Sequence, residues 1–211
     1  MELSPEQIGQ FETFEGNLYA TNAVMNLTRV PREECWLRHF VDSLLFQDLL
    51  PQGASVLDIG SGPGFPAWPL ACARPDLTVT ALDSSGKMLG FLQRNPLPNL
   101  TPVLARAEDW GVREEFDVVT GRALAPLPIQ LELSMAPLKI GGLIVPMRTP
   151  GEEGAAKAFP AEKLGLRPAG LHRRPLPGTD IVRLFTVYEK VAATDLAYPR
   201  SWADIKRKPL G

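Results

Sequence analysis

The clearest candidate for chemistry in this sequence is a glycine-rich segment that follows a short apolar run. Val56–Ile59 leads directly into Gly60-Ser61-Gly62-Pro63-Gly64-Phe65-Pro66. Glycines let a backbone approach a ligand closely, and a helix that begins after such a turn presents unpaired N–H groups. We therefore expect Gly60, Gly62 and Gly64 to cradle a ligand. The alternative is a tight strand-to-helix connection that binds nothing.

An acidic residue ends the next apolar run. Asp83 follows Thr78–Leu82 and lies 19 residues after Gly64. Nucleotide-binding α/β folds place an acid at about this distance from the glycine turn, on the hydroxyls of a ribose. Asp83 can also cap the helix expected over Ser84–Gln93, and the two roles are compatible. The spacing predicts a ligand that contains ribose.

Two further features favour S-adenosylmethionine over a nicotinamide cofactor. The three glycines form G-x-G-x-G, whereas dinucleotide enzymes use G-x-G-x-x-G. The last two apolar runs, Leu164–Arg174 and Ile181–Lys190, have no helix between them, which predicts an antiparallel hairpin that is unusual in dinucleotide enzymes. Glu108 and Trp110, after the third run, are candidates to face an adenine ring. A nicotinamide oxidoreductase remains an alternative.

The elements that must position these residues alternate between strands and helices. Such alternation predicts a mostly parallel sheet with helices on both faces, and the carboxyl ends of its strands are where open α/β sheets bind ligands. The expected parallel strands are Val56–Ile59, Thr78–Leu82, Pro102–Ala105, Phe116–Thr120 and Leu143–Met147.

Two helices are expected before the sheet. The first covers Ser4 to Asn26, with a capping sequence at its start and an interruption near Gly16-Asn17. The second begins after Pro31 and continues to Leu50. We expect one compact unit with an N-terminal helical extension (1–53), an α/β domain (54–192) and a basic C-terminal tail (193–211).

Composition limits the classes of function. The 211 residues are 45% hydrophobic and 22% charged, which is typical of a globular domain. With 22 Lys and Arg against 24 Asp and Glu, the net charge is −2, so any contact with nucleic acid must use local basic clusters. Cys35 and Cys72 lack the spacing of a metal site or a disulfide framework. Neither a signal peptide nor a membrane span is visible, so we expect a cytoplasmic protein. We also expect a monomer that binds no metal.

Several motifs follow one another in an order that resembles the bacterial RsmG (GidB) family, and together they span nearly the whole chain. In chain order they are Asn26-Leu27-Thr28-Arg29, His39-Phe40-Val41-Asp42-Ser43-Leu44, the stretch from Leu57-Asp58 to Pro69-Leu70-Ala71, Leu82-Asp83-Ser84 with Lys87, Arg122-Ala123, Tyr198-Pro199-Arg200 and Lys208-Pro209-Leu210. The resemblance implies a Rossmann-like S-adenosyl-L-methionine-dependent methyltransferase fold, with a seven-stranded sheet that ends in an antiparallel hairpin. It also implies methylation of guanine N7 in 16S ribosomal RNA of the small ribosomal subunit.

The resemblance also implies particular site residues. The cofactor would contact Gly60 and Phe65 in the turn, Ala107 and Glu108 after the third strand, and Arg122 after the fourth. The chain departs from the family pattern at Ala67, Trp68, Met88 and Arg148-Thr149, and Asn95-Pro96-Leu97-Pro98 replaces a longer helix end and loop. None of these departures falls on an expected cofactor contact, so we expect cofactor binding to be intact. We expect the surface that faces RNA to be altered.

Basic residues and one histidine are the candidates for recognition of RNA. Arg122, Arg148 and His39 can each donate to guanine O6 or to a phosphate. Because N7 of guanine carries no proton, the reaction needs no general base, and its rate should not follow the titration of a histidine. The tail residues expected to contact phosphates are Arg200, Lys206, Arg207 and Lys208. We expect loss of the tail to leave cofactor affinity unchanged.

Two alternatives to this reaction remain open at the level of sequence. One is a methyltransferase of the same fold that acts on another acceptor, since a cofactor motif does not identify the acceptor. The other is a ribosome-binding assembly factor with a vestigial cofactor pocket. The intact glycine turn and Asp83 disfavour the second alternative.

Overall fold

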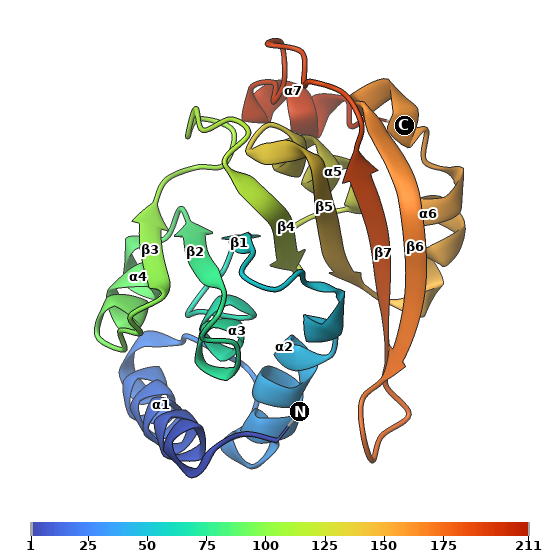
Figure 1. The fold of residues 1–211 in the computed structure, drawn as a ribbon. Helices are drawn as coiled ribbons and strands as arrows, with labels where there is room; N and C mark the ends of the chain where they lie inside the picture. Colours follow the sequence, from blue (N-terminus) through green and yellow to red (C-terminus); the bar gives the residue numbers. More distant parts are fainter. Residues whose placement is uncertain (1, 211) are drawn as a thin grey trace.

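A seven-stranded sheet organises the chain in the computed structural model, which describes residues 2–210 (Figure 1). Its order is β3-β2-β1-β4-β5-β7-β6. Strands β1 to β5 are parallel, and β7 runs antiparallel to both of its neighbours, β5 and β6. This arrangement confirms the mostly parallel sheet with a terminal hairpin. The strands are β1 (Ser55–Ile59), β2 (Thr78–Asp83), β3 (Leu100–Leu104), β4 (Phe116–Arg122), β5 (Leu138–Arg148), β6 (Leu166–Pro175) and β7 (Val182–Lys190).

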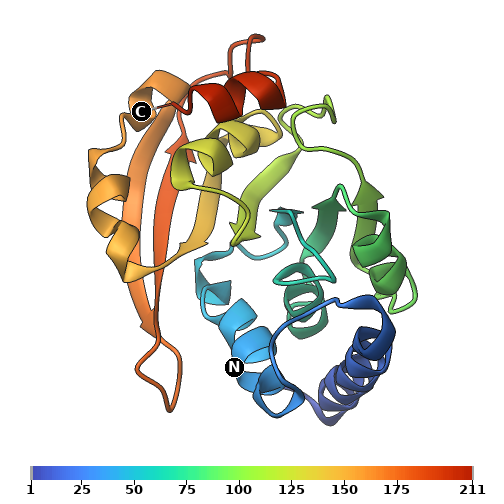
Figure 2. The ribbon, with the colours of Figure 1, turned by 180° about the vertical axis from the view of Figure 1, so that it is seen from behind.

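Helices cover both faces of this sheet (Figures 1 and 2). They are α1 (Pro5–Met25), a π-helical turn (Trp36–Val41) that continues into α2 (Asp42–Leu44), α3 (Ala67–Ala73), α4 (Gly86–Gln93), α5 (Leu127–Met135), α6 (Glu153–Ala158) and α7 (Trp202–Arg207). Short 3₁₀ turns occupy Arg32–Glu34, Gln47–Leu49, Pro150–Glu152 and Ala161–Leu164. None of the helices within residues 2–210 is long and apolar enough to span a membrane.

Each face of the sheet has its own hydrophobic core. Side chains of a strand alternate between the two faces, and in β1 the consecutive residues Val56 and Leu57 accordingly belong to different cores. The core around Val56 is filled by α1, α3 and α4, and the core around Leu57 by α5 and α6 together with Ile205 of α7. Burial on both faces explains why the strands read as short continuous apolar runs.

Helix α1 covers the expected stretch and runs through it without an interruption. The Ser4 hydroxyl accepts from the Gln7 amide, and the Gln7 side chain accepts from the Ser4 amide, which completes the capping box. The expected interruption near Gly16-Asn17 is wrong. A glycine inside a helix costs about 1 kcal/mol, whereas each large side chain buried beside it, such as Phe14 or Leu18, contributes about 1.5–3 kcal/mol.

The second expected helix is shorter than the sequence pattern suggested. The α-helical hydrogen bonding ends at Leu44 instead of Leu50, and a π turn precedes it, in which the Asp42 amide donates to the Leu37 carbonyl. Such turns accommodate one extra residue and are frequent at functional sites. Here Phe40 packs on Phe11, while His39 and Asp42 contact side chains that the sheet carries.

Candidate active site

The glycine-rich turn lies at the carboxyl end of β1, as expected. The amides of Gly60 and Ser61 both donate to the Leu82 carbonyl of β2, at 2.8 and 3.1 Å, which ties the turn to the neighbouring strand. Gly60 has a φ of 72°, and a Cβ added there would lie 2.5 Å from Cδ1 of Leu124. Gly62 has a φ of 57° and nothing within 4 Å of an added Cβ. Backbone conformation therefore explains both glycines, and open space remains beside Gly62.

Asp83 holds the turn in place through its carboxylate. One oxygen accepts from the Gly62 amide at 2.8 Å, and the other accepts from the Ser85 amide at 2.7 Å. The helix cap of α4 is Ser85, whose hydroxyl accepts from the Met88 amide. The capping alternative for Asp83 is therefore not what the structure shows. Its carboxylate joins the ends of β1 and β2 instead.

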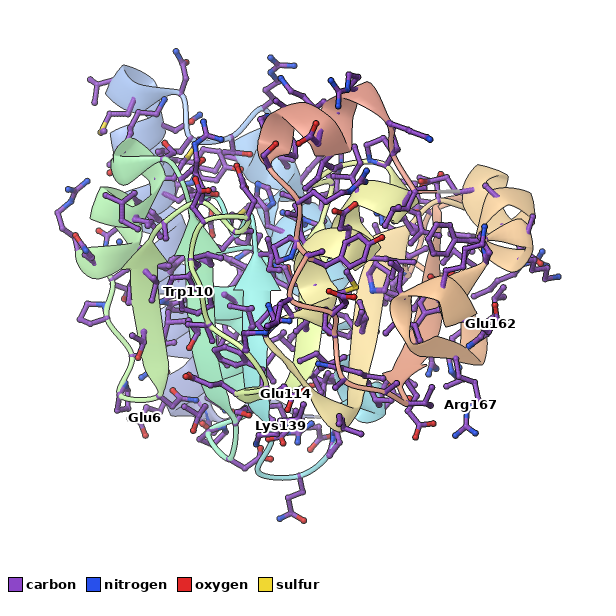
Figure 3. All side chains as sticks on the ribbon, turned by 90° about the horizontal axis from the view of Figure 1, so that it is seen from above. Glu6, Trp110, Glu114, Lys139, Glu162 and Arg167 are labelled. Atoms are coloured by element: carbon purple, nitrogen blue, oxygen red, sulfur yellow. The ribbon has the colours of Figure 1, made fainter. Side chains whose placement is uncertain are left out.

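A cavity of about 210 Å³, which we call the Asp83 hollow, opens at this edge of the sheet. The residues that line it include Gly60, Asp83, Arg106, Ala107, Glu108, Leu124 and Trp202. The structure thus brings together four of the residues expected to bind a cofactor. Trp110 does not line the Asp83 hollow. Its ring packs against Phe116 and lines an adjoining cavity. Figure 3 labels Trp110 near β2 and β3.

Phe65 and Arg122, also expected to contact a cofactor, lie outside the Asp83 hollow, on the other side of the turn. The ring of Phe65 stacks on the ring of His39, with centroids 4.1 Å apart and an interplanar angle of 3°. The Arg122 guanidinium lies 5.2 Å from the Phe65 ring centroid. Phe65 therefore supports both candidate recognition residues from one side.

The hydrogen bonds of His39 determine its proton position. Nδ1 lies 3.2 Å from Nη2 of Arg122, and because an arginine only donates, Nδ1 must accept. The other nitrogen, Nε2, then carries the proton and donates to the Thr28 hydroxyl at 2.7 Å. Burial, followed by the nearby charges of Arg122 and Arg38, lowers the pKa of His39 to about 3. The imidazole is neutral at physiological pH.

Asp42 joins two arginines from different strands. Its carboxylate accepts from Nε and Nη2 of Arg183 on β7, at 2.7 and 2.9 Å, and from Nη1 of Arg122 on β4 at 3.4 Å. The Asp42 side chain is 1% exposed. Burial lowers the pKa of Arg122, which the charge of Asp42 opposes. This buried carboxylate fixes the direction in which Arg122 points.

A second cavity, of about 330 Å³, lies beside these arginines, and we call it the Arg122 hollow. The charged residues and the histidine that define it are Arg38, His39, Asp42, Arg122, Arg148, Glu152 and Arg183. With four arginines against two carboxylates, the hollow is positively charged at neutral pH. It suits a ligand that is anionic or rich in hydrogen-bond acceptors.

The two hollows are separated by the segment that leaves β4. Arg122 and Ala123 line the Arg122 hollow, and the next residue, Leu124, lines the Asp83 hollow. Ala123 has a φ of 53°, a conformation that costs a residue with a side chain about 1–2 kcal/mol. A strained, well-held turn thus lies between two cavities at the ligand-binding edge of the sheet.

Sequence reasoning missed Asp58. This residue of β1 is fully buried, and one carboxylate oxygen accepts from the Ala67 amide at 3.0 Å. The other oxygen, and the hydroxyl of Ser61, have no hydrogen-bond partner among the described residues. Burial raises the pKa of Asp58 to about 7. A sequence signal for Asp58 exists, because it is a carboxylate inside an otherwise apolar strand that leads into the glycine turn.

Two of the basic residues expected to contact RNA donate from their guanidinium groups to partners within the fold, although Nε of Arg148 has no partner among the described residues. Arg148 is buried and donates to the Ala125 carbonyl at 2.7 Å and to the side chain of Gln130. Arg200 pairs with the buried Glu132 at 2.6 Å. Three other basic residues of the tail, Lys206, Arg207 and Lys208, are exposed. Across residues 2–210, no group of three or more His, Cys, Asp or Glu is placed to hold a metal ion.

The fold defines the class of this protein. The chain is similar to a solved S-adenosylmethionine-dependent methyltransferase from Aquifex aeolicus, with a TM-score of 0.57 and 15% identity over 74% of this chain and 93% of that one. It is also similar to the 1,6-didemethyltoxoflavin-N1-methyltransferase of Burkholderia thailandensis, solved with S-adenosylhomocysteine, with a TM-score of 0.56 and 16% identity over 91% and 92% of the chains. The fold is that of the S-adenosylmethionine-dependent methyltransferases.

The family follows from sequence similarity over nearly the whole chain. Residues 7–167 match the model of the GidB family, described as rRNA small subunit methyltransferase G. The ribosomal RNA small subunit methyltransferase G of Lactobacillus delbrueckii subsp. bulgaricus is 38% identical, over 99% of this chain and 94% of that protein. The protein of the same name from Moorella thermoacetica is 36% identical, over 99% and 92%. The chain belongs to the GidB family, which confirms the resemblance seen in its motifs.

Proposed function

We propose that this chain transfers a methyl group from S-adenosyl-L-methionine to N7 of a guanine in 16S ribosomal RNA of the small ribosomal subunit. The observation that carries the proposal is the pair of hollows on either side of Arg122–Leu124. One is lined by a glycine turn and carboxylates, and the other by arginines. The relatives are ribosomal RNA small subunit methyltransferases by name, which supports small-subunit ribosomal RNA as the acceptor.

The residues of the Asp83 hollow fit the cofactor. Gly60 lines the cavity, open space remains beside Gly62, and Asp83 and Glu108 are acceptors suited to ribose hydroxyls. Asp58 and Ser61 do not line this hollow, but they lie on either side of Gly60 in the chain, and each has a buried oxygen without a hydrogen-bond partner among the described residues, which a ligand or a water molecule could supply. When bound, the cofactor supplies an electrophilic methyl group on a sulfonium.

The residues of the Arg122 hollow fit guanine. The base presents two neighbouring acceptors, O6 and N7, and arginine is the side chain that most often recognises them. Arg122 is held by Asp42, His39 and Phe65, so its free donors have a defined direction. Arg38 and Arg183 line the same cavity and can neutralise a flanking phosphate.

Methyl transfer to guanine N7 requires that the reacting atoms be oriented, and it requires no proton transfer. Guanine N7 carries a free lone pair at neutral pH, and a neutral His39 with a pKa near 3 matches a reaction without a general base. Holding reacting atoms near ~3–3.5 Å in line lowers the barrier by several kcal/mol. The protein residues therefore act by holding the base, fixing its orientation and excluding water.

Binding of the larger substrate uses surface charge. Lys206, Arg207 and Lys208 are exposed, which supports phosphate contacts that depend on salt and are insensitive to sequence. A protein of this kind would act as a monomer in the cytoplasm. These parts of the proposal rest on the basic clusters and on the family.

Single-turnover methylation tests the proposal. Labelled S-adenosylmethionine is mixed with deproteinised small-subunit RNA or with assembled small subunits, and the modified nucleotide is identified by mass spectrometry. We expect N7-methylguanosine, formed at a rate that stays constant from pH 6 to 8. Arg122→Gln should abolish methylation while S-adenosylhomocysteine still binds. A methyl group on an exocyclic amine or a ribose hydroxyl would contradict the proposed acceptor.

A further inference from the structure

The C-terminal tail is docked on the α/β domain by buried and directional contacts. Arg200 donates from Nε and Nη2 to the carboxylate of Glu132 on α5, which is fully buried, at 2.8 and 2.6 Å. Arg113, in the loop between β3 and β4, donates to the carbonyls of Thr194 and Tyr198 at 2.8 and 3.0 Å. These contacts fix the path of the chain that leads into α7.

Packing of α7 completes this docking. Ile205 is fully buried in the core that α5 and α6 share, and Ser201 caps the helix by accepting from the Asp204 amide. In Figures 1 and 2, α7 lies against α5 at one end of the sheet. The helix is therefore held in position and rotation, and the direction of each of its side chains is determined.

The docked helix places an aromatic side chain at the cofactor site. Trp202, the first residue of α7, lines the Asp83 hollow together with Gly60, Asp83 and Glu108. The rest of the lining includes the carboxylates of Asp83 and Glu108, which suit ribose hydroxyls, the polar Ser84 and Arg106, and apolar side chains such as Leu124. An indole beside these apolar side chains provides a flat surface for a purine ring.

The face of α7 that points to solvent carries positive charge. Lys206 lies one helical turn after Trp202, with Nζ 5.6 Å from the centroid of the indole ring. Lys206 and Arg207 are both exposed. The same short helix therefore lines the cofactor hollow with Trp202 and presents an exposed basic side chain, Lys206, beside that indole.

We propose that Trp202 is a cofactor-binding residue, and that its indole forms the wall of the Asp83 hollow on which the adenine of S-adenosylmethionine packs. The tail then belongs to the cofactor site as well as to the surface that meets RNA. This inference rests on the proposed function, because it assumes that the Asp83 hollow holds the cofactor. It replaces the expectation that loss of the tail leaves cofactor affinity unchanged.

Calorimetric titration of the full chain with S-adenosylhomocysteine tests the inference. Stacking of a base on an aromatic side chain implies a loss of affinity of about tenfold in Trp202→Ala, and Trp202→Phe should recover most of it. The matched control is Ala203→Ser, the next residue of the same helix, which is exposed and should bind as tightly as the unchanged chain. Truncation after Ala197 should weaken binding at least as much as Trp202→Ala.

Fluorescence provides a second measurement that does not depend on the stability of the alanine variant. Binding of S-adenosylhomocysteine should change the emission of the unchanged chain, and most of that change should disappear in Trp202→Phe although this variant still binds. An unchanged signal in Trp202→Phe, or an alanine variant that binds as tightly as the unchanged chain, would overturn the inference. If the unchanged chain itself fails to bind S-adenosylhomocysteine or S-adenosylmethionine, the proposed function fails, and the inference fails with it.

Discussion

The Asp83 hollow and the Arg122 hollow share one edge of the sheet and are built in different ways. The first is made largely of backbone and of residues that directly follow β1, β2 and β3. The second depends on charged side chains that meet from distant parts of the chain, since Asp42 contacts Arg122 and Arg183, which follow it by 80 and 141 residues.

This difference determines how each site should respond to substitution. A backbone turn tolerates changes that preserve its conformation and the space beside it. A buried carboxylate shared by two arginines tolerates no loss of charge, because the arginines would remain without a partner. The Arg122 hollow should therefore be coupled to the stability of the fold, and the Asp83 hollow mainly to ligand affinity.

The largest expected effect comes from Asp42→Asn. Loss of a buried carboxylate that pairs with two partly buried arginines should lower the free energy of unfolding by about 3 kcal/mol, as measured in urea. Methylation should be lost as well. The matched control is Asp48→Asn, whose carboxylate pairs with Arg174 at the surface, and it should cost less than about 1 kcal/mol. Equal losses in the two variants would remove the distinction between the hollows.

The next effect concerns pH. The pKa of His39 is about 3 in the fold, whereas its ordinary value is 6.5. As pH falls, the imidazole therefore becomes protonated in the unfolded chain before it does so in the folded chain. The contribution of His39 to stability is present above pH 6.5 and falls by about 2 kcal/mol between pH 6.5 and 5.

Asp58 shows the opposite dependence. Its pKa is about 7 in the fold, whereas its ordinary value is 3.8, so between these values the carboxyl group is protonated in the folded chain and ionised in the unfolded chain. Its contribution is lost as pH rises through 7, and it increases by about 2 kcal/mol between pH 6.5 and 5.

These two contributions cancel in the unchanged chain, and single substitutions should reveal them. His39→Gln should become more stable relative to the unchanged chain as pH falls from 6.5 to 5, and Asp58→Asn should become less stable. Urea unfolding at several values of pH across this interval measures both. Parallel curves for the two variants would show that the burial of His39 and Asp58 does not control their protons.

A smaller effect is expected for Gly60→Ala. The added methyl group would push Leu124 into the Asp83 hollow, so affinity for S-adenosylhomocysteine should fall by about tenfold in calorimetry. Gly178→Ala is the matched control, because its φ of 73° is the same within a degree and nothing lies within 4 Å. Both variants should lose about 1 kcal/mol of stability, and only Gly60→Ala should lose affinity. A loss of affinity in neither variant would mean that Leu124 moves away from the hollow.

The smallest effect should come from the exposed tail. Lys208→Gln should lower the slope of the logarithm of RNA affinity against the logarithm of salt concentration by about 1, with no change in the binding of S-adenosylhomocysteine. Lys139→Gln serves as the control, since Lys139 pairs with Asp117 near the start of β5 and is labelled in Figure 3. The same reduction in slope for both lysines would indicate a general effect of charge rather than a phosphate contact.

Much of the fold could be predicted because its signals are local. The apolar runs placed all seven strands, and the Pro-Gly segment before Ile181 indicated the hairpin. Errors arose where tertiary packing overrides local preference. Buried aromatic side chains keep α1 continuous through Gly16, and the π turn that brings His39 and Asp42 to the sheet has no local signature.

The candidate site was predictable to the extent that it follows the strands. Gly60, Asp83, Ala107 and Glu108 come together because they end or follow adjacent strands of a parallel sheet. Arg148 and Arg200 illustrate the limit of this reasoning. Their charge suggested contact with RNA, which stays a prediction. No pattern in the sequence indicates that their guanidinium groups also pair with Gln130 and Glu132 inside the fold.

The sequence by itself determined the family, the sheet and the glycine turn, because periodicity and turn chemistry act between residues that are close in the chain. Only the tertiary structure decided which charges meet and which side chains close the cavities. Asp42 and Arg183, or Trp202 and Gly60, are separated by more than a hundred residues. Their contact depends on the order of strands, the rotation of helices and the docking of the tail, and these are set by how the two cores pack.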